Sequence, residues 1–68
     1  MVEQDEILKR YDSGISNNNY LIKDFQSKRY LLITRELVGE HYSYWILAKG
    51  MKSIQEYIVK NELVEIEI

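Results

Sequence analysis

Residues 29–49 read RYLLITRELVGEHYSYWILAK, and Gly39-Glu40 divides this stretch into two runs rich in β-branched and aromatic residues. A Gly-X pair between two such runs is typical of a two-residue type II′ turn, because glycine takes the positive φ angle that the first turn position requires. The stretch therefore predicts a β-hairpin with strands over residues 29–38 and 41–49.

This turn also predicts the register, with Val38 opposite His41 and every earlier residue opposite a later one. Side chains alternate between the two faces of a strand, so the predicted pairs divide into two sets. We expect the more uniformly apolar set to face the core: Leu31, Ile33, Arg35 and Leu37 with Tyr42, Tyr44, Ile46 and Ala48. The other set is polar near the turn and carries an apolar cluster farther along: Tyr30, Leu32, Trp45 and Leu47.

The N-terminal segment VEQDEILKRYDSGI has apolar residues at helical spacing. Ile7, Leu8, Tyr11 and Ile15 recur at this spacing, with acidic residues early and basic residues late, as the helix dipole favours. Gly14 suits the position just after a helix end. We therefore expect a helix over residues 3–12.

The remaining segments complete a mixed domain. YLIKDF (20–25) is rich in β-formers, and Ser53 with Glu56 forms the pattern of a capping box before a helix over 54–60. LVEIEI (63–68) alternates strictly, as in a half-buried edge strand. The predicted class is α+β, a single domain over residues 1–68 in the order α-β-β-β-α-β. Both helices are expected on one face of an antiparallel or mixed sheet.

Sixty-eight residues bury only about 60% of the surface that the unfolded chain exposes, so the core is thin. The chain has no Cys and a single His, which excludes disulfides and predicts neither a metal nor a cofactor. No apolar run is long enough to span a bilayer, and we expect a cytoplasmic protein. Residues with AT-rich codons, such as Ile, Lys, Asn and Tyr, are abundant, which indicates a low-GC bacterial or phage origin.

The sequence contains no combination of residues typical of a catalytic site. His41 lies near Glu36 and Glu40 on the predicted hairpin, but no second His, Cys or suitably placed Ser completes a catalytic set. Glu65 and Glu67 share one face of a strand, an arrangement typical of a solvated surface. We therefore expect no enzymatic activity and no small-molecule substrate.

Two binding functions remain, and both use the sheet. In the first, the face away from the helices binds another protein or a second copy of the chain, because exposed aromatic and apolar patches mark partner sites. The residues expected in this contact are Tyr30, Leu32, His41, Trp45 and Leu47. An inhibitor or modulator of a host protein, from a phage or mobile element, fits this interpretation.

In the alternative, the protein is a nucleic-acid-binding regulator, because bases beside sheet aromatics can contact phosphates while the rings stack on nucleobases. The basic residues for this function are Lys23, Lys28, Arg29, Arg35 and Lys49. The net charge of −2 makes this function less favourable, since phosphate contacts dominate such affinities.

Overall fold

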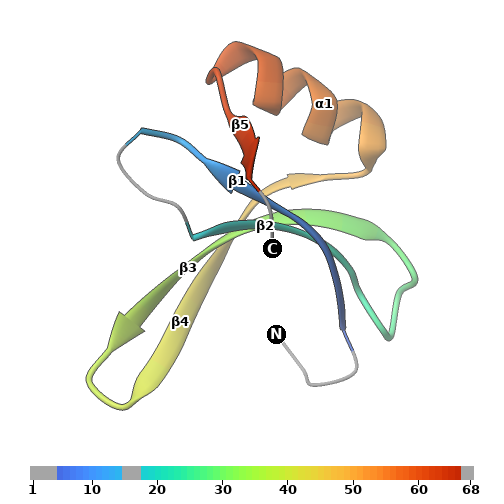
Figure 1. Ribbon diagram of the computed structural model, residues 1–68. Helices are drawn as coiled ribbons and strands as arrows, with labels where there is room; N and C mark the ends of the chain where they lie inside the picture. Colours follow the sequence, from blue (N-terminus) through green and yellow to red (C-terminus); the bar gives the residue numbers. More distant parts are fainter. Residues whose placement is uncertain (1–4, 15–17, 67–68) are drawn as a thin grey trace.

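The computed structural model describes residues 5–14 and 18–66, which form an antiparallel sheet of five strands and one short helix (Figure 1). The elements are β1 (Glu6–Asp12), β2 (Asn19–Lys23), β3 (Tyr30–Val38), β4 (His41–Lys49), α1 (Met51–Lys60) and β5 (Val64–Ile66). The strands lie in the order β4-β3-β2-β1-β5. β1 to β4 thus follow one another across the sheet, and α1 carries the chain from β4 at one edge to β5 at the other.

The predicted α+β class with two helices is wrong, because the N-terminal helix is absent among the described residues. Residues 6–12 form β1 instead, and residues 3 and 4 lie outside the described residues. β1 pairs with β2 on one side and with β5 on the other, so its backbone groups are bonded across two neighbours. This pairing overrides the helix-favouring residues Glu6, Lys9 and Arg10. The register of β1 shifts between Ile7 and Lys9, a bulge that disturbs simple alternation.

The helix α1 begins earlier than predicted and without the expected capping box. Gly50 is the N-cap residue with φ +83°, and its carbonyl accepts the first helical hydrogen bond from the Ile54 amide at 2.9 Å. Ser53 lies inside the helix and no side chain caps its start. Its inward face is apolar, because Ile54 is fully buried and Tyr57 and Ile58 pack around it.

The end of α1 directs the chain into β5. Glu62 takes a positive φ of 54°, and the Leu63 amide donates to the Ile58 carbonyl at 3.0 Å, as in a Schellman motif. β5 then pairs antiparallel with β1, Asp12 opposite Val64. Val64 is exposed although the strict alternation of LVEIEI predicts a half-buried strand with Val64, Ile66 and Ile68 on one face, and Ile68 lies outside the described residues.

The apolar core is divided between the two faces of the sheet. On the helix face, which α1 covers, the buried cluster comprises Tyr11, Leu21, Leu32 and Ile54. On the opposite face, a smaller buried cluster comprises Tyr20, Ile22 and Ile33. The predicted faces of the hairpin are therefore reversed: Leu32 lies under the helix, and the set with Ile33 lies on the other side. Both sets are apolar, so apolarity alone did not reveal which side α1 covers.

The predicted hairpin is confirmed up to one bulge. Gly39 has φ +64° and Glu40 does not have a positive φ, which is the pattern of a type II′ turn. The pairs from Val38 with His41 to Ile33 with Ile46 occur as predicted. Leu47 is then an extra residue in β4, so that Leu32, and not Leu31, lies opposite Ala48.

The β3–β4 hairpin is longer than the sheet that supports it. β2 pairs with β3 only between Tyr30 and Thr34, and the last bond to this side runs from the Arg35 amide to the Asn18 carbonyl at 3.0 Å. Beyond Arg35, β3 pairs with β4 alone. The end of the hairpin therefore projects as a two-stranded ribbon, visible in Figure 1 as the long arm that ends between β3 and β4.

Candidate functional site

The projecting hairpin carries a concentration of exposed large apolar side chains. Six of them have exposed fractions between 44% and 60%, and we call them the hairpin patch: Leu37, Val38, Tyr42, Tyr44, Trp45 and Ile46. The other exposed large apolar residues are spread over β1, the β2–β3 loop, α1 and β5. The hairpin patch is therefore the main apolar surface among the described residues.

The hairpin patch lies on both faces of the ribbon. Leu37 pairs with Tyr42 on the face opposite α1, whereas Trp45 pairs with Thr34 on the helix face. Trp45 is exposed although it shares this face with buried Leu32. A ribbon of two strands has no third strand on either side to cover such side chains.

Arg35 lies between two tyrosine rings where the hairpin patch meets the rest of the sheet. Its guanidinium carbon lies 4.8 Å from the ring centroid of Tyr20 and 4.4 Å from that of Tyr42. Its Nη2 donates a hydrogen bond to the Tyr20 hydroxyl at 3.2 Å. Arg35 therefore connects the buried cluster on the face opposite α1 to the exposed ring of Tyr42, with cation–π attraction on both sides.

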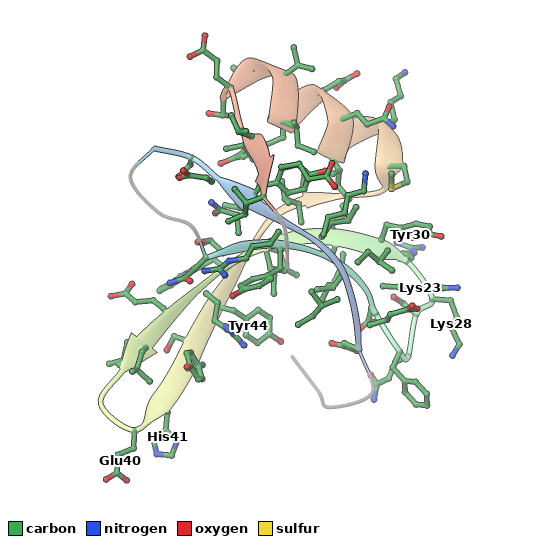
Figure 2. The ribbon with its side chains drawn as sticks, in the orientation of Figure 1. Lys23, Lys28, Tyr30, Glu40, His41 and Tyr44 are labelled. Carbon is green, nitrogen blue, oxygen red and sulfur yellow. The ribbon has the colours of Figure 1, made fainter. Side chains whose placement is uncertain are left out.

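The five residues predicted to contact a partner differ in their exposure. Leu32 is fully buried and cannot reach a partner in the folded protein. Tyr30 and Leu47 are partly buried and pack against the helix-face cluster. Trp45 and His41 are exposed, and His41 lies at the end of the ribbon beside Glu40 (Figure 2). Only these last two keep the predicted exposure.

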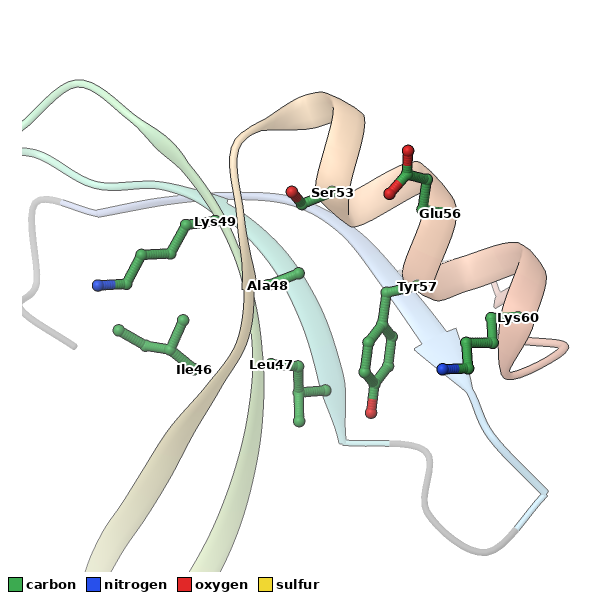
Figure 3. Close-up of a pocket in the computed structure, with 8 residues that line it drawn as sticks. All are labelled: Ile46, Leu47, Ala48, Lys49, Ser53, Glu56, Tyr57 and Lys60. Carbon is green, nitrogen blue, oxygen red and sulfur yellow. The ribbon is translucent and has the colours of Figure 1, made fainter.

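A groove runs between α1 and the C-terminal end of β4. Its lining residues come from both elements: Ile46, Leu47, Ala48, Lys49, Ser53, Glu56, Tyr57 and Lys60. Figure 3 shows Leu47 beside the ring of Tyr57, whereas Ile46 and Lys49 point away from the helix. The helix therefore accompanies β4 only in its second half, and residues 41–45 lie beyond this groove.

Four of the five basic residues predicted to contact nucleic acid lie near the end of the sheet remote from the hairpin turn. Lys23 and Lys28 lie there with Tyr30 (Figure 2), and Arg29 and Lys49 line a nearby hollow. Acidic side chains accompany them, because Asp5 and Asp24 line the same hollow. The Lys28 ammonium lies 4.4 Å from the ring centroid of Phe25. The fifth residue, Arg35, lies apart, between Tyr20 and Tyr42.

The β2–β3 loop in this region is held by a carboxylate. Asp24 accepts hydrogen bonds from the Ser27 hydroxyl at 2.6 Å and from the Ser27 amide at 2.8 Å. These bonds favour the charged form and lower the pKa of the Asp24 carboxyl, chiefly through the hydroxyl. The Asp5 carboxylate accepts from the Phe25 amide at 2.8 Å and ties the loop to the start of β1. Side-chain carboxylates thus bond the backbone of this loop at two points, Phe25 and Ser27.

Within residues 5–14 and 18–66, no three His, Cys, Asp or Glu side chains come together as a metal site would require. The described part of the chain also contains no helix with the length and apolarity to cross a membrane.

Sequence reasoning missed most of the hairpin patch because it assigned Tyr42, Tyr44 and Ile46 to the core. A usable signal was present in the strand lengths. The runs around Gly39-Glu40 each span about ten residues, whereas the preceding run YLIKDF has six. Because a short strand can support only part of a longer neighbour, this difference predicts an unsupported end.

A scan against protein-family models, a search of curated proteins and a search of solved structures each find no match to this chain.

Proposed function

We propose that this protein is a non-enzymatic module that binds another protein through the hairpin patch. The single observation that carries the proposal is the exposure of six large apolar side chains on the projecting ribbon. The proposal keeps the function expected from the sequence but moves the contact from the Tyr30 and Leu32 cluster to the end of the hairpin. The cytoplasmic location and the phage or mobile-element origin stay predictions from composition.

The composition of the hairpin patch supports a protein partner. Tyr, Trp and Arg are the residues most enriched among those that dominate binding energy at interfaces. Here Tyr42, Tyr44 and Trp45 are exposed on one strand, and Arg35 stacks against Tyr42. Because these rings lie on paired strands, binding has less backbone entropy to remove than it would from a flexible loop.

Nucleic-acid binding has less support from the arrangement of charges. Arg35 is engaged by two tyrosine rings, and Lys28 lies over Phe25. Asp5 and Asp24 lie in the same hollow as Arg29 and Lys49, so this end of the sheet does not present a uniformly basic surface. Affinity for nucleic acid depends mainly on such surfaces.

The proposal is tested by affinity capture from a lysate of the source cells, with and without nuclease, followed by mass spectrometry. We expect the wild-type protein to capture a partner that resists nuclease. The variant Leu37→Ser/Tyr42→Ser should lose this partner, because both side chains lie at the exposed end of the ribbon.

A matched control is Phe25→Ser/Val59→Ser, which removes two exposed apolar side chains outside the hairpin. This variant should capture the partner as the wild type does. Retention of the partner by the hairpin variant, or loss of all captured protein after nuclease treatment, would contradict the proposal.

A further inference from the structure

The two edges of the sheet differ in their ability to pair with another strand. β5 is three residues long, and its Glu65 forms an ion pair with Lys9 at 3.4 Å. β4 is nine residues long, and between His41 and Ile46 it contains neither Pro nor a Lys, Arg, Asp or Glu. Natural edge strands are protected by short length, Pro, bulges or charge. β5 has such protection, whereas β4 has it only at its C-terminal end, where the bulge at Leu47 precedes Lys49.

The register of the hairpin shows which backbone groups of β4 point outward. In a two-residue hairpin the pair beside the turn, Val38 with His41, is hydrogen-bonded, and hydrogen-bonded pairs alternate with pairs that are not. The amide and carbonyl groups of Tyr42, Tyr44 and Ile46 therefore point away from β3. No strand in the described ranges 5–14 and 18–66 pairs with this outer edge.

We propose that β4 pairs antiparallel with β4 of a second copy of the chain, about a two-fold axis at Tyr44. This goes beyond the proposed function, because it uses the backbone edge of the hairpin and names a different partner. Tyr44 would then exchange hydrogen bonds with Tyr44 of the second copy, and Tyr42 with Ile46 of the second copy. A two-fold interface of this kind uses the same residues on both sides.

In that register, the side chains of β4 in one copy are compatible with those of β4 in the second copy. Ser43 lies opposite Trp45 of the second copy, and Tyr42 opposite Ile46, so residues 42–46 bring no like charges together. Because Leu47 is an extra residue in β4, it shifts the register by one position beyond Ile46. Lys49 of one copy then lies opposite Glu40 of the other at each end of the paired segment. Opposite charges thus meet at both ends of the paired segment.

The helix leaves room for this pairing. The groove between α1 and β4 involves residues 46–49, so Ile46 is the one residue of the paired segment 42–46 that lines it. Figure 2 shows Tyr44 on the hairpin arm, with the Glu40 end of this arm far from the helix. The second copy approaches along the edge of β4, so Leu37 and Val38 stay exposed on the two faces.

The test is the mass in solution, measured by analytical ultracentrifugation over a range of concentrations. We expect the wild-type protein to reach twice the mass of the 8.2 kDa chain. Tyr44→Pro removes one outward amide without removing a bond to β3, and edge strands accept Pro at such positions. This variant should raise the dimer Kd by at least about tenfold over that of Tyr44→Ala, which keeps the amide.

Charge reversal tests the register without touching the backbone. Glu40→Lys and Lys49→Glu should each raise the dimer Kd by roughly two- to fivefold per ion pair, and the double variant should restore it. Within one copy Glu40 precedes β4 and Lys49 ends it, so the two are separated by the length of the strand and restoration can only arise between copies.

A monomeric wild type at about millimolar concentration would overturn the inference, and so would equal Kd values for Tyr44→Pro and Tyr44→Ala. Failure of the double charge variant to restore the dimer would overturn the register. Circular dichroism of each variant separates loss of the dimer from loss of the fold. None of these outcomes depends on capture of a different protein, so the proposed function is judged separately.

Discussion

The two ends of β3 have similar apolar residues and opposite environments. At the base, Leu32 and Ile33 are fully buried, one on each face of the sheet, whereas at the tip Leu37 and Val38 are more than half exposed. The difference lies in the neighbours, because β2 and α1 support the base and only β4 accompanies the tip. An apolar strand therefore becomes core or binding surface according to what lies beside it.

The same substitution at two positions of β3 gives the largest expected contrast. Leu32→Ala should lower the free energy of unfolding by about 2–5 kcal/mol, because it leaves a cavity under α1. Leu37→Ala should change it by less than about 0.5 kcal/mol, because the side chain is already exposed. Urea unfolding followed by circular dichroism measures both. Equal losses would mean that the tip is covered in the folded protein.

The turn is the next most sensitive point of the tip. Gly39→Ala should lower the free energy of unfolding by about 1–3 kcal/mol, because an L-residue is strained at φ +64°. Glu40→Ala is the matched control, since Glu40 does not have a positive φ, and it should have little effect. Thermal melts of both variants test this, and a stable Gly39→Ala variant would argue against the type II′ turn.

Arg35 contacts Tyr20 at the base of the hairpin and Tyr42 toward its tip. The coupling energy between Arg35 and Tyr42 therefore measures the interaction between these two parts of the hairpin. A double-mutant cycle of Arg35→Met and Tyr42→Leu should give a coupling energy of about 0.5–1 kcal/mol, as for a partly exposed cation–π pair. The same cycle with Arg35→Met and Tyr57→Leu should give no coupling, because Tyr57 packs on the helix face. A coupling energy of zero between Arg35 and Tyr42 would contradict this cation–π contact between the base and the tip of the hairpin.

The smallest effect is expected at the β2–β3 loop. The pKa of Asp24 is lowered by its bonds to Ser27, so the folded loop favours the charged carboxylate. Its contribution to stability is present above the unfolded value of about 3.9 and is lost as the pH falls through the lower folded value. An NMR titration of the Ser27 amide should follow this loss, and Asp24→Asn should abolish it. A midpoint at or above the unfolded value would contradict the hydrogen bonds.

Local sequence predicted the hairpin well because its turn chemistry acts over a few residues. Gly39 and the pairing from His41 to Ile46 follow from the turn alone. The bulge at Leu47 does not, because it depends on how β4 leaves the sheet toward α1. The helix predicted over residues 3–12 was wrong over residues 6–12 for a similar reason. Pairing with β2 and β5 decides the conformation of β1, and β5 is distant in sequence.

The exposure of the hairpin aromatics was predicted for Trp45 but not for Tyr42 and Tyr44. The sequence indicated an aromatic surface on the hairpin and included Trp45, which is exposed. It placed Tyr42 and Tyr44 in the core because both sides of the hairpin are apolar and the position of α1 is a long-range property. The helix α1 crosses the sheet from β4 to β5, and this connection decides which face it covers. The residues of the hairpin alone do not predict that face.

The pairing of β1 with β5 also affects the order in which the molecule forms. Asp12 and Val64 lie far apart along the chain, so their contact requires closure of a long loop, whereas the hairpin closes over a two-residue turn. During synthesis β5 is made after the whole of β3 and β4. We therefore expect the hairpin, with its exposed aromatic rings, to be available for contact before the opposite edge of the sheet is complete.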